Sequence, residues 1–404
     1  MDEHRQPSRS ARGTAARWWL VLALVLAVIL TGTAVVLHAI LGPTAPELAP
    51  ASPTPTPTTA PTTAASRAEP GTPVVIRAGN GPLLPGTGTG EIYAQSATAI
   101  FRVELPTGRI TRTPTPDLEE HVSFLAGPGW VLVKSRWSPT GVLVRDGRPA
   151  SPLPQQFDPE GFLHAGQGGR LWVEPEWGTE PRVATTLQLA QLDGRPVVGR
   201  TVTAPRAAAP YAIEPDGYGG VLLTDRRGVY RLDPDRAGHP SRITLISRGD
   251  LIAAGGRRLL VWDCHTHARC QMVLVDQQTR QRARRPAAAA VLGAKGGIGL
   301  DRDAYGDEQL SPDGTHLAVM ASDPTGTLRA HVIDLRDGRD TTLPGAGTDA
   351  NANRQLAWST NSRWLFALTD QQIRAYDTRV RTLANVPLGG ERLLHLTTVN
   401  APAW

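Results

Sequence analysis

The sequence predicts an all-β fold in which short strands form repeating four-stranded sheets. Three observations lead to this prediction: the composition, a hairpin pattern that recurs seven times, and an apolar strand before most copies of that pattern. The 404 residues include 41 Gly and 35 Pro but only 5% aromatic residues, which is typical of many short strands joined by turns. A single all-β core can exceed the average domain in length, so the chain does not have to divide into two folded domains.

The chain begins with a short basic tail and a long apolar segment. Residues 1–17 carry a formal net charge of +2, and residues 18–41 (Trp18 to Leu41) form 24 residues without a formal charge. As a helix this segment would be about 36 Å long, enough to cross a hydrocarbon core of about 30 Å. Because arginines precede it and few basic residues follow it, we expect a single-pass membrane helix with the N-terminus in the cytoplasm. The alternative is a signal peptide cleaved after Ala34.

Residues 42–72 are rich in Pro, Thr and Ala and cannot bury a core. Such a segment is expected to be a disordered linker with a bias toward extended polyproline conformation. It could reach about 90 Å. We therefore expect it to tether the remaining residues, 73–404, to the membrane on the extracytoplasmic side.

One hairpin pattern occurs seven times beyond the tether. Each copy has an alternating apolar strand, a turn rich in Asp or Gly, and a second strand that begins after a polar residue. The copies begin at Ala99, Gly141, Leu187, Gly228, Cys270, Ala330 and Gln372. One marker residue lies in each: Leu105, Asp146, Asp193, Asp233, Asp276, Asp334 and Asp377. The markers are 41, 47, 40, 43, 58 and 43 residues apart, and this period matches a propeller blade of about 40 to 50 residues.

Apolar strands precede six of the hairpins and complete the blades. They lie within residues 129–137, 169–177, 219–227, 257–264, 315–322 and 362–370. Tryptophans recur in four of them, where a large ring can fill the space between neighbouring blades: Trp130, Trp172, Trp262 and Trp364. We therefore predict a β-propeller of four-stranded blades, seven in number, with six or eight as alternatives.

The two ends of the repeat region predict how the ring closes. Residues 391–400 form an apolar strand with no hairpin after it, whereas the strand at 91–97 and the first hairpin lack an inner strand before them. Pairing of these two ends would hide both sheet edges. Residues 73–78 (PVVIRA) are an alternative source of that inner strand.

Two segments carry a family resemblance. Residues 309–322 (QLSPDGTHLAVMAS) and 356–370 (LAWSTNSRWLFALTD) resemble the strand-turn-strand signature of TolB-like and WD40-like propeller repeats. The resemblance covers these two blades, and the G-H and W-D pairs of true WD40 repeats do not recur. It implies a propeller that binds a partner, usually a protein, on its top face or in its central channel, and it does not imply catalysis.

The two cysteines, Cys264 and Cys270, stand at the ends of consecutive predicted strands. Since we expect this region to be exported to an oxidising space, a disulfide across the hairpin is the leading interpretation. A zinc site that includes His265 and His267 is an alternative, although one tight turn would have difficulty directing four ligands at a single ion. A pair of free thiols is the other alternative.

The longest interval between markers contains an insertion with a basic and an acidic run. The basic run, residues 280–286 (RQRARRP), is a candidate surface for an anionic envelope polymer or an acidic partner, and the acidic run is residues 301–308 (DRDAYGDE). The candidate binding residues of this insertion are Arg280, Arg282, Arg284, Arg285, Asp301 and Asp303. The acidic run resembles the start of a calcium loop, but Pro312 stands where a bidentate Glu is required, so a solvated loop is favoured over a metal site.

No catalytic or cofactor-binding motif was found. The sequence lacks H-E-x-x-H, G-x-S-x-G and a sialidase-type Asp box, and residues 293–300 lack the ending of a phosphate-binding loop. The net charge of +5 is too small to predict nucleic-acid binding. We therefore predict a membrane-anchored, extracytoplasmic propeller that acts as a non-catalytic protein- or ligand-binding module at the cell envelope. The alternative is a hydrolase or lyase with a noncontiguous site in the central channel.

Overall fold

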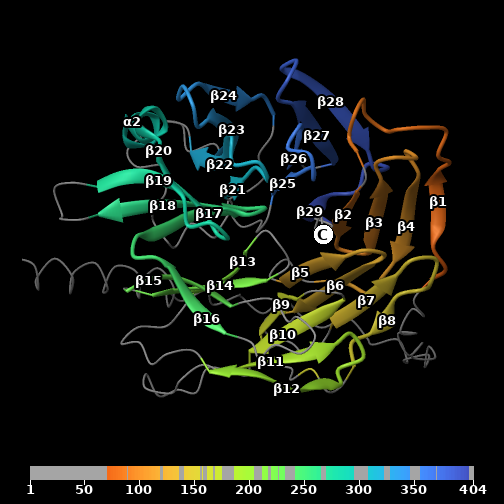
Figure 1. Cartoon of the computed structure of the whole chain (residues 1–404). Coiled ribbons are helices and arrows are strands. Elements are labelled where there is room, and N and C mark those ends of the chain that lie inside the picture. Colours follow the sequence, from red (N-terminus) through yellow and green to blue (C-terminus); the bar gives the residue numbers. More distant parts are fainter. Residues whose placement is uncertain are drawn as a thin grey trace, which may run out of the picture. The chain divides into compact units, whose positions relative to one another are not determined.

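The computed structural model describes most of residues 71–399 (Figure 1). Outside the described part lie residues 1–70 and 400–404 and the internal positions 89, 119–121, 136–140, 155–156, 158–161, 167–168, 175–185, 204–211, 217–219, 226, 233–241, 265–269, 295–307, 323–327, 346–354 and 370. The predicted membrane helix and nearly all of the tether therefore lie outside the described residues. None of the helices within the described part has the length and apolar character needed to span a bilayer. The chain divides into two compact units, Met1–Ala65 and Ser66–Trp404, and all of the described structure belongs to the second.

The described strands form seven antiparallel sheets, the blades of a β-propeller. Blade 1 contains β1 (Val74–Arg77), β2 (Glu91–Ser96), β3 (Ala99–Glu104), β4 (Ile110–Pro114) and β29 (Leu393–Thr398). Blade 2 contains β5 (Val122–Gly127), β6 (Trp130–Ser135), β7 (Gly141–Arg145) and β8 (Ser151–Pro152). Blade 3 contains β9 (Phe162–Ala165), β10 (Arg170–Glu174), β11 (Thr186–Gln191) and β12 (Pro196–Thr203). Blade 4 contains β13 (Ala212–Pro215), β14 (Val221–Asp225), β15 (Gly228–Leu232) and β16 (Ile243–Ser247).

The last three blades follow the same order. Blade 5 contains β17 (Asp250–Gly255), β18 (Arg258–Cys264), β19 (Cys270–Asp276) and β20 (Arg282–Arg284), followed by helix α2 (Pro286–Ala294). Blade 6 contains β21 (Gln309–Leu310), β22 (His316–Ser322), β23 (Leu328–Asp334) and β24 (Asp340–Leu343). Blade 7 contains β25 (Leu356–Trp358), β26 (Trp364–Leu368), β27 (Gln372–Asp377) and β28 (Thr382–Pro387). The predicted fold and the count of seven blades are confirmed, and each predicted hairpin forms the third and fourth strands of its blade.

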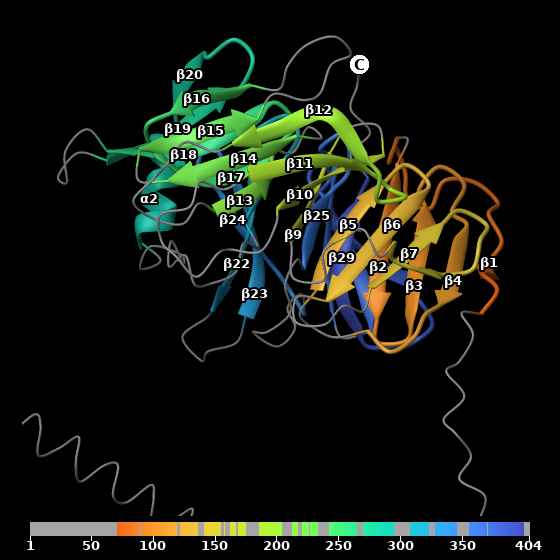
Figure 2. The same ribbon diagram turned by 90° about the horizontal axis from the view of Figure 1, so that it is seen from below.

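The ring is closed by strands from opposite ends of the domain. β29 pairs antiparallel with β2, with Ile92 opposite Thr398, and the two strands lie side by side in Figures 1 and 2. β1 instead pairs with β4 as the outermost, fifth strand of blade 1. The alternative in which residues 73–78 supply the inner strand is therefore wrong. The physical reason is burial: β29 buries four consecutive residues, Leu393–Leu396, whereas all four residues of β1 are exposed.

The hydrophobic core is divided into clusters between neighbouring blades. Trp130 packs with residues of blades 2 and 3, Trp172 with blades 3 and 4, and Trp364 with blades 7 and 1. These three rings are 6%, 1% and 3% exposed. Trp262 is partly buried against the cluster between blades 5 and 6. Large rings thus fill the wedge between blades, as their recurrence in the sequence predicted.

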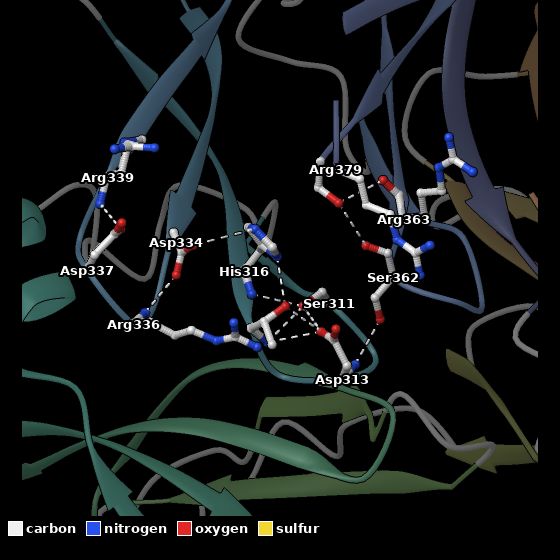
Figure 3. Close-up of polar contacts among 12 residues, drawn as sticks. Ser311, Asp313, His316, Asp334, Arg336, Asp337, Arg339, Ser362, Arg363 and Arg379 are labelled. Atoms are coloured by element: carbon white, nitrogen blue, oxygen red, sulfur yellow. Dashed lines mark hydrogen bonds and ion pairs between the residues drawn. The ribbon is translucent and has the colours of Figure 1, made fainter. Parts of the chain in front are cut away.

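The S-P-D-G segment forms a hydrogen-bonded turn between β21 and β22 (Figure 3). Ser311 Oγ accepts hydrogen bonds from the backbone N–H groups of Thr315 (3.1 Å) and His316 (2.9 Å), and it donates to Asp313 Oδ1 (2.7 Å). Burial by itself would raise the pKa of Asp313, but hydrogen bonds from Ser311 and Thr315 outweigh it and hold that pKa below its ordinary value. The backbone N–H of Asp313 donates to Ser362 Oγ in blade 7 (2.9 Å), so this turn also joins two blades.

The corresponding turn of blade 7 has the same design. Ser359 Oγ accepts from the backbone N–H of Trp364 (2.9 Å) and donates to Asn361 Oδ1 (2.8 Å). Asn361 Nδ2 and Trp364 Nε1 then donate to the carbonyls of Gly86 (2.7 Å) and Pro85 (3.1 Å), which belong to the segment between β1 and β2. The residues behind the family resemblance therefore form turns whose hydrogen bonds join neighbouring blades.

Candidate functional site

A cleft of about 760 Å³ lies between the outer parts of blades 4 and 5. One wall is the last part of β16 and the residue after it, Leu245 to Arg248. The other wall consists of side chains from β18, β19 and β20: Asp263, Cys264, Gln271, Val273, Arg282 and Arg284. Two arginines of the basic run that the sequence singled out, Arg282 and Arg284, therefore line a concave site.

The alternation of β20 directs two of its arginines into this cleft. Arg284 lies opposite Val273, and Ala283 between the arginines lies opposite Leu274. Val273 belongs to the apolar cluster between blades 4 and 5, whereas Leu274 belongs to the cluster between blades 5 and 6. Because successive side chains of a strand point to opposite faces, Arg282 and Arg284 both face blade 4.

Two hydrogen bonds bridge the blades at the end of the cleft where β19 turns into β20. Arg280 Nη1 donates to the carbonyl of Leu245 (3.2 Å), and Arg231 Nη1 donates to the carbonyl of Gln277 (3.4 Å). Arg280 has a φ of 62°, and its N–H closes the turn by a bond to the carbonyl four residues earlier. Gly338 closes the turn of blade 6 by the same bond with a φ of 74°. A non-glycine residue is disfavoured in this conformation, and here its side chain provides a bridge that glycine could not.

The charges of the cleft are incompletely paired. Arg282 forms an ion pair with Asp263. Arg248 and Arg284 form no ion pair and no side-chain hydrogen bond with any other residue that the structure describes. Among the residues that the structure describes, three guanidinium groups thus face one carboxylate, which leaves two positive charges and their N–H donors available to a ligand.

The boundary between blades 1 and 2 shows what a paired cluster looks like in this fold. Arg102 bonds to Glu91 and Asp146 and lies 3.2 Å from Glu104. Tyr93 donates to Glu91 Oε2 (2.8 Å), and burial together with the charge of Glu91 raises the pKa of the phenol. Every charge here is engaged with a neighbouring strand or blade. The arginine-lined cleft differs because two of its cations have no such partner among the described residues.

A disulfide joins Cys264 and Cys270 at the end of the β18–β19 hairpin, where the two residues are directly opposite. It fixes the hairpin end that carries Asp263 and Gln271 into the cleft wall. His265 and His267 lie outside the described residues. Within the described ranges, no group of three or more His, Cys, Asp or Glu side chains is placed to hold a metal ion.

The structure changes the interpretation of the insertion. Arg282 and Arg284 belong to the regular outer strand of blade 5, not to an inserted loop, and helix α2 follows them. The helix packs against blades 5 and 6 through Ala288 and Leu292, which are 0% and 8% exposed. Arg285 donates to the carbonyl of Arg284 and does not line the cleft.

Asp301 and Asp303 lie outside the described residues, so the acidic half of the predicted insertion stays a prediction. Sequence reasoning missed Arg248, Asp263 and Gln271. Their signal is weak because Arg248 follows a strand of blade 4, whereas Asp263 and Gln271 lie opposite each other in the β18–β19 hairpin of blade 5. Only the adjacency of blades 4 and 5 brings the three together.

The chain matches no protein-family model and no curated protein. Similar solved structures include AztD from Citrobacter koseri (11% identity, TM-score 0.40, 77% of this chain and 89% of that one) and TolB from Acinetobacter baumannii (11%, 0.37, 77% and 82%). A candidate 6-phosphogluconolactonase from Bacteroides fragilis is also similar (14%, 0.42, 78% and 99%). At these TM-scores the similarities say nothing about a ligand or an activity. The propeller fold is established by the strand pairing described above.

Proposed function

We propose that this protein is a membrane-anchored, extracytoplasmic binding module at the cell envelope and that the arginine-lined cleft is its recognition site. The observation that carries the proposal is the pair of uncompensated arginines, Arg248 and Arg284, in a cleft of about 760 Å³. The apolar segment at residues 18–41 and the tether at 42–72 support the anchoring part.

The lining of the cleft is mainly polar and charged, with a smaller apolar part. Ligand pockets usually combine apolar walls with a few polar groups that fix orientation. Leu245 supplies apolar surface here and is 41% exposed, whereas Val273 is 2% exposed. Arginine offers five N–H donors in a planar fork that matches carboxylate and phosphate groups. A ligand with an anionic group and an apolar part would therefore satisfy both kinds of surface.

A capture experiment with the full-length protein tests the binding role. Tagged protein would be cross-linked in membranes and purified in three forms: wild type, the double variant Arg248→Ala/Arg284→Ala, and the control Arg148→Ala. Arg148 is exposed in the β7–β8 turn and has no ion pair among the described residues. We expect a captured species that the double variant loses and the control retains. Equal capture by all three forms would contradict the proposal.

Anchoring and catalysis have separate readouts. The mass of the mature protein distinguishes a retained helix from cleavage after Ala34, and accessibility of the domain to protease in whole cells reports its side of the membrane. If the captured species is a small molecule that the protein converts to a product, the competing proposal of a propeller enzyme gains support and the non-catalytic role is wrong.

A further inference from the structure

We infer that the ligand of the arginine-lined cleft is an extended acidic peptide segment with carboxylates on alternate residues, which adds to the free edge of β20. This inference rests on the proposed binding function and names the chemistry of that same site. It commits to a segment of a protein partner, because the cleft offers both an unpaired strand edge and a period-two pattern of positive charge.

No strand that the structure describes pairs with the outer edge of β20, so this edge is available for strand addition. β20 is the last strand of its sheet, and all three of its residues are exposed. Helix α2 does not occupy the face toward the cleft, because its buried residues belong to the cluster between blades 5 and 6. An exposed edge presents unpaired N–H and C=O groups to another extended chain.

The pattern of hydrogen bonds between β19 and β20 shows which backbone N–H and C=O groups of β20 face outward. Gln281 accepts at its carbonyl from Asp276 (2.9 Å), and Arg285 donates its N–H to Met272 (2.9 Å), so these flanking residues bond inward to β19. In an antiparallel pair, inward-bonded and outward-facing residues alternate. The backbone groups of Arg282 and Arg284 therefore face outward.

The carbonyl of Arg284 already accepts from the side chain of Arg285 (3.1 Å). Three outward backbone groups remain without a hydrogen bond to any described residue: the N–H and C=O of Arg282 and the N–H of Arg284. An added strand could engage all three.

The side chains of the same two residues supply the specificity. Arg282 and Arg284 are two apart and point to the same face, so an added strand places its own alternate side chains beside them. Arg248 approaches from the opposite wall of the cleft. A Glu-x-Glu pattern would pair with these cations, whereas two adjacent carboxylates would point to opposite faces and only one could enter the cleft.

Asp263 provides a substitution that should strengthen peptide binding. Its carboxylate pairs with Arg282 and so competes with the incoming peptide. Replacing it by Asn removes one negative charge from the wall and releases Arg282. We therefore expect Asp263→Asn to bind the peptide more tightly than wild type, a gain that a merely structural role of Asp263 would not produce.

The test is direct binding of labelled peptides to the full-length protein in detergent, measured by fluorescence polarisation. The probes are acetyl-VETEV-amide, the neutral acetyl-VQTQV-amide and the non-alternating acetyl-VTEEV-amide. We expect VETEV to bind and to lose about ten-fold or more in affinity with Arg284→Ala, as for loss of a charge-assisted hydrogen bond. Asp263→Asn should tighten binding, and the control Arg148→Ala should leave it unchanged. Thermal unfolding checks that each variant is folded.

Backbone methylation tests strand addition itself. Of two VETEV peptides methylated on alternate amide nitrogens, the one blocked toward β20 should lose binding and the other should retain it. Three results would overturn the inference. VETEV and VTEEV could bind equally, the two methylated peptides could bind equally, or glutarate could compete with VETEV at the same concentration. Failure of VETEV together with cleft-dependent capture of a cellular partner would refute the peptide and leave the proposed function standing. Capture that ignores the cleft variants would refute the proposed function itself.

Discussion

The closure of the ring by β29 can be tested with one substitution, Leu396→Ala. Leu396 is 1% exposed and belongs to the cluster between blades 7 and 1, together with Ile92 and Phe366. Truncation of a fully buried leucine to alanine removes its transfer free energy and leaves a cavity, which together reduce stability by about 3 kcal/mol. For a domain of about 330 residues, with an unfolding entropy of about 2.1 cal/mol/K per residue, this corresponds to a fall in Tm of about 4 °C.

The measurement is thermal unfolding by calorimetry, compared with two matched controls. Leu383→Ala, in β28, truncates a leucine that is 37% exposed, and Val75→Ala truncates a residue of β1 that is 44% exposed. Each control should change the free energy of unfolding by about 0.5 kcal/mol or less. If Leu396→Ala lowers Tm no more than the controls do, or if Val75→Ala lowers it more, β29 does not close the ring and the reasoning from burial is wrong.

Three further predictions concern the disulfide, a buried ion pair and a bond between blades. Replacing Cys264 and Cys270 by Ser should reduce the free energy of unfolding in urea by about 2 kcal/mol, since the disulfide closes a short loop. The replacement should also weaken capture of the ligand at the cleft. Unchanged capture would show that the end of the hairpin does not need the disulfide to hold its position. Asp377 is 1% exposed. Burial alone would raise the pKa of this carboxyl, but hydrogen bonds from Arg363 and from backbone N–H groups lower the pKa below its ordinary value. The ionised carboxylate therefore stabilises the fold above about pH 4, and this stabilisation is lost as the pH falls through the lowered pKa. Asp377→Asn should therefore unfold more easily by about 3 kcal/mol at pH 7, and this difference should shrink in melts at low pH; a difference that is constant with pH would contradict the assignment. Trp358→Phe should lose about 1 kcal/mol, because the indole N–H donates to a carbonyl of blade 6 (2.9 Å), and a melt equal to that of wild type would exclude a role for that bond.

The local parts of the fold were predictable from sequence because their signals are local. Alternating apolar residues and turn chemistry mark the outer hairpins, and a denser apolar run marks the second strand of most blades. The inner strands were largely missed. β5, β9, β13 and β17 were not predicted. β21 and β25, with two and three residues, are too short to show a period, and only the family resemblance included them in strand-turn-strand segments. Helix α2 was also missed, although the alanine-rich stretch at Pro286–Ala294 has high helix propensity.

The candidate site could be predicted only in part. The arginines at 280–285 are close together in the sequence, and this cluster predicted a binding surface. The residues that surround them in the cleft are far away in the sequence: Arg248 follows a strand of another blade, and Asp263 lies on a different hairpin. Arg282 is neutralised by a single ion pair across strands, with Asp263, and Arg284 has no such pair among the described residues. Such pairing is a property of tertiary structure, which no spacing in the sequence encodes.

The position of β1 has a mechanical consequence. The chain before residue 71 enters the propeller through this strand, which has four exposed residues and pairs with β4 alone. Any pull transmitted along that chain therefore reaches β1 first and can separate it from β4 residue by residue. The strands that close the ring, β2 and β29, lie on the other side of blade 1, and the segment between β1 and β2 is itself hydrogen-bonded to blades 1 and 7. The outermost strand can therefore detach without breaking the pairing of β2 with β29.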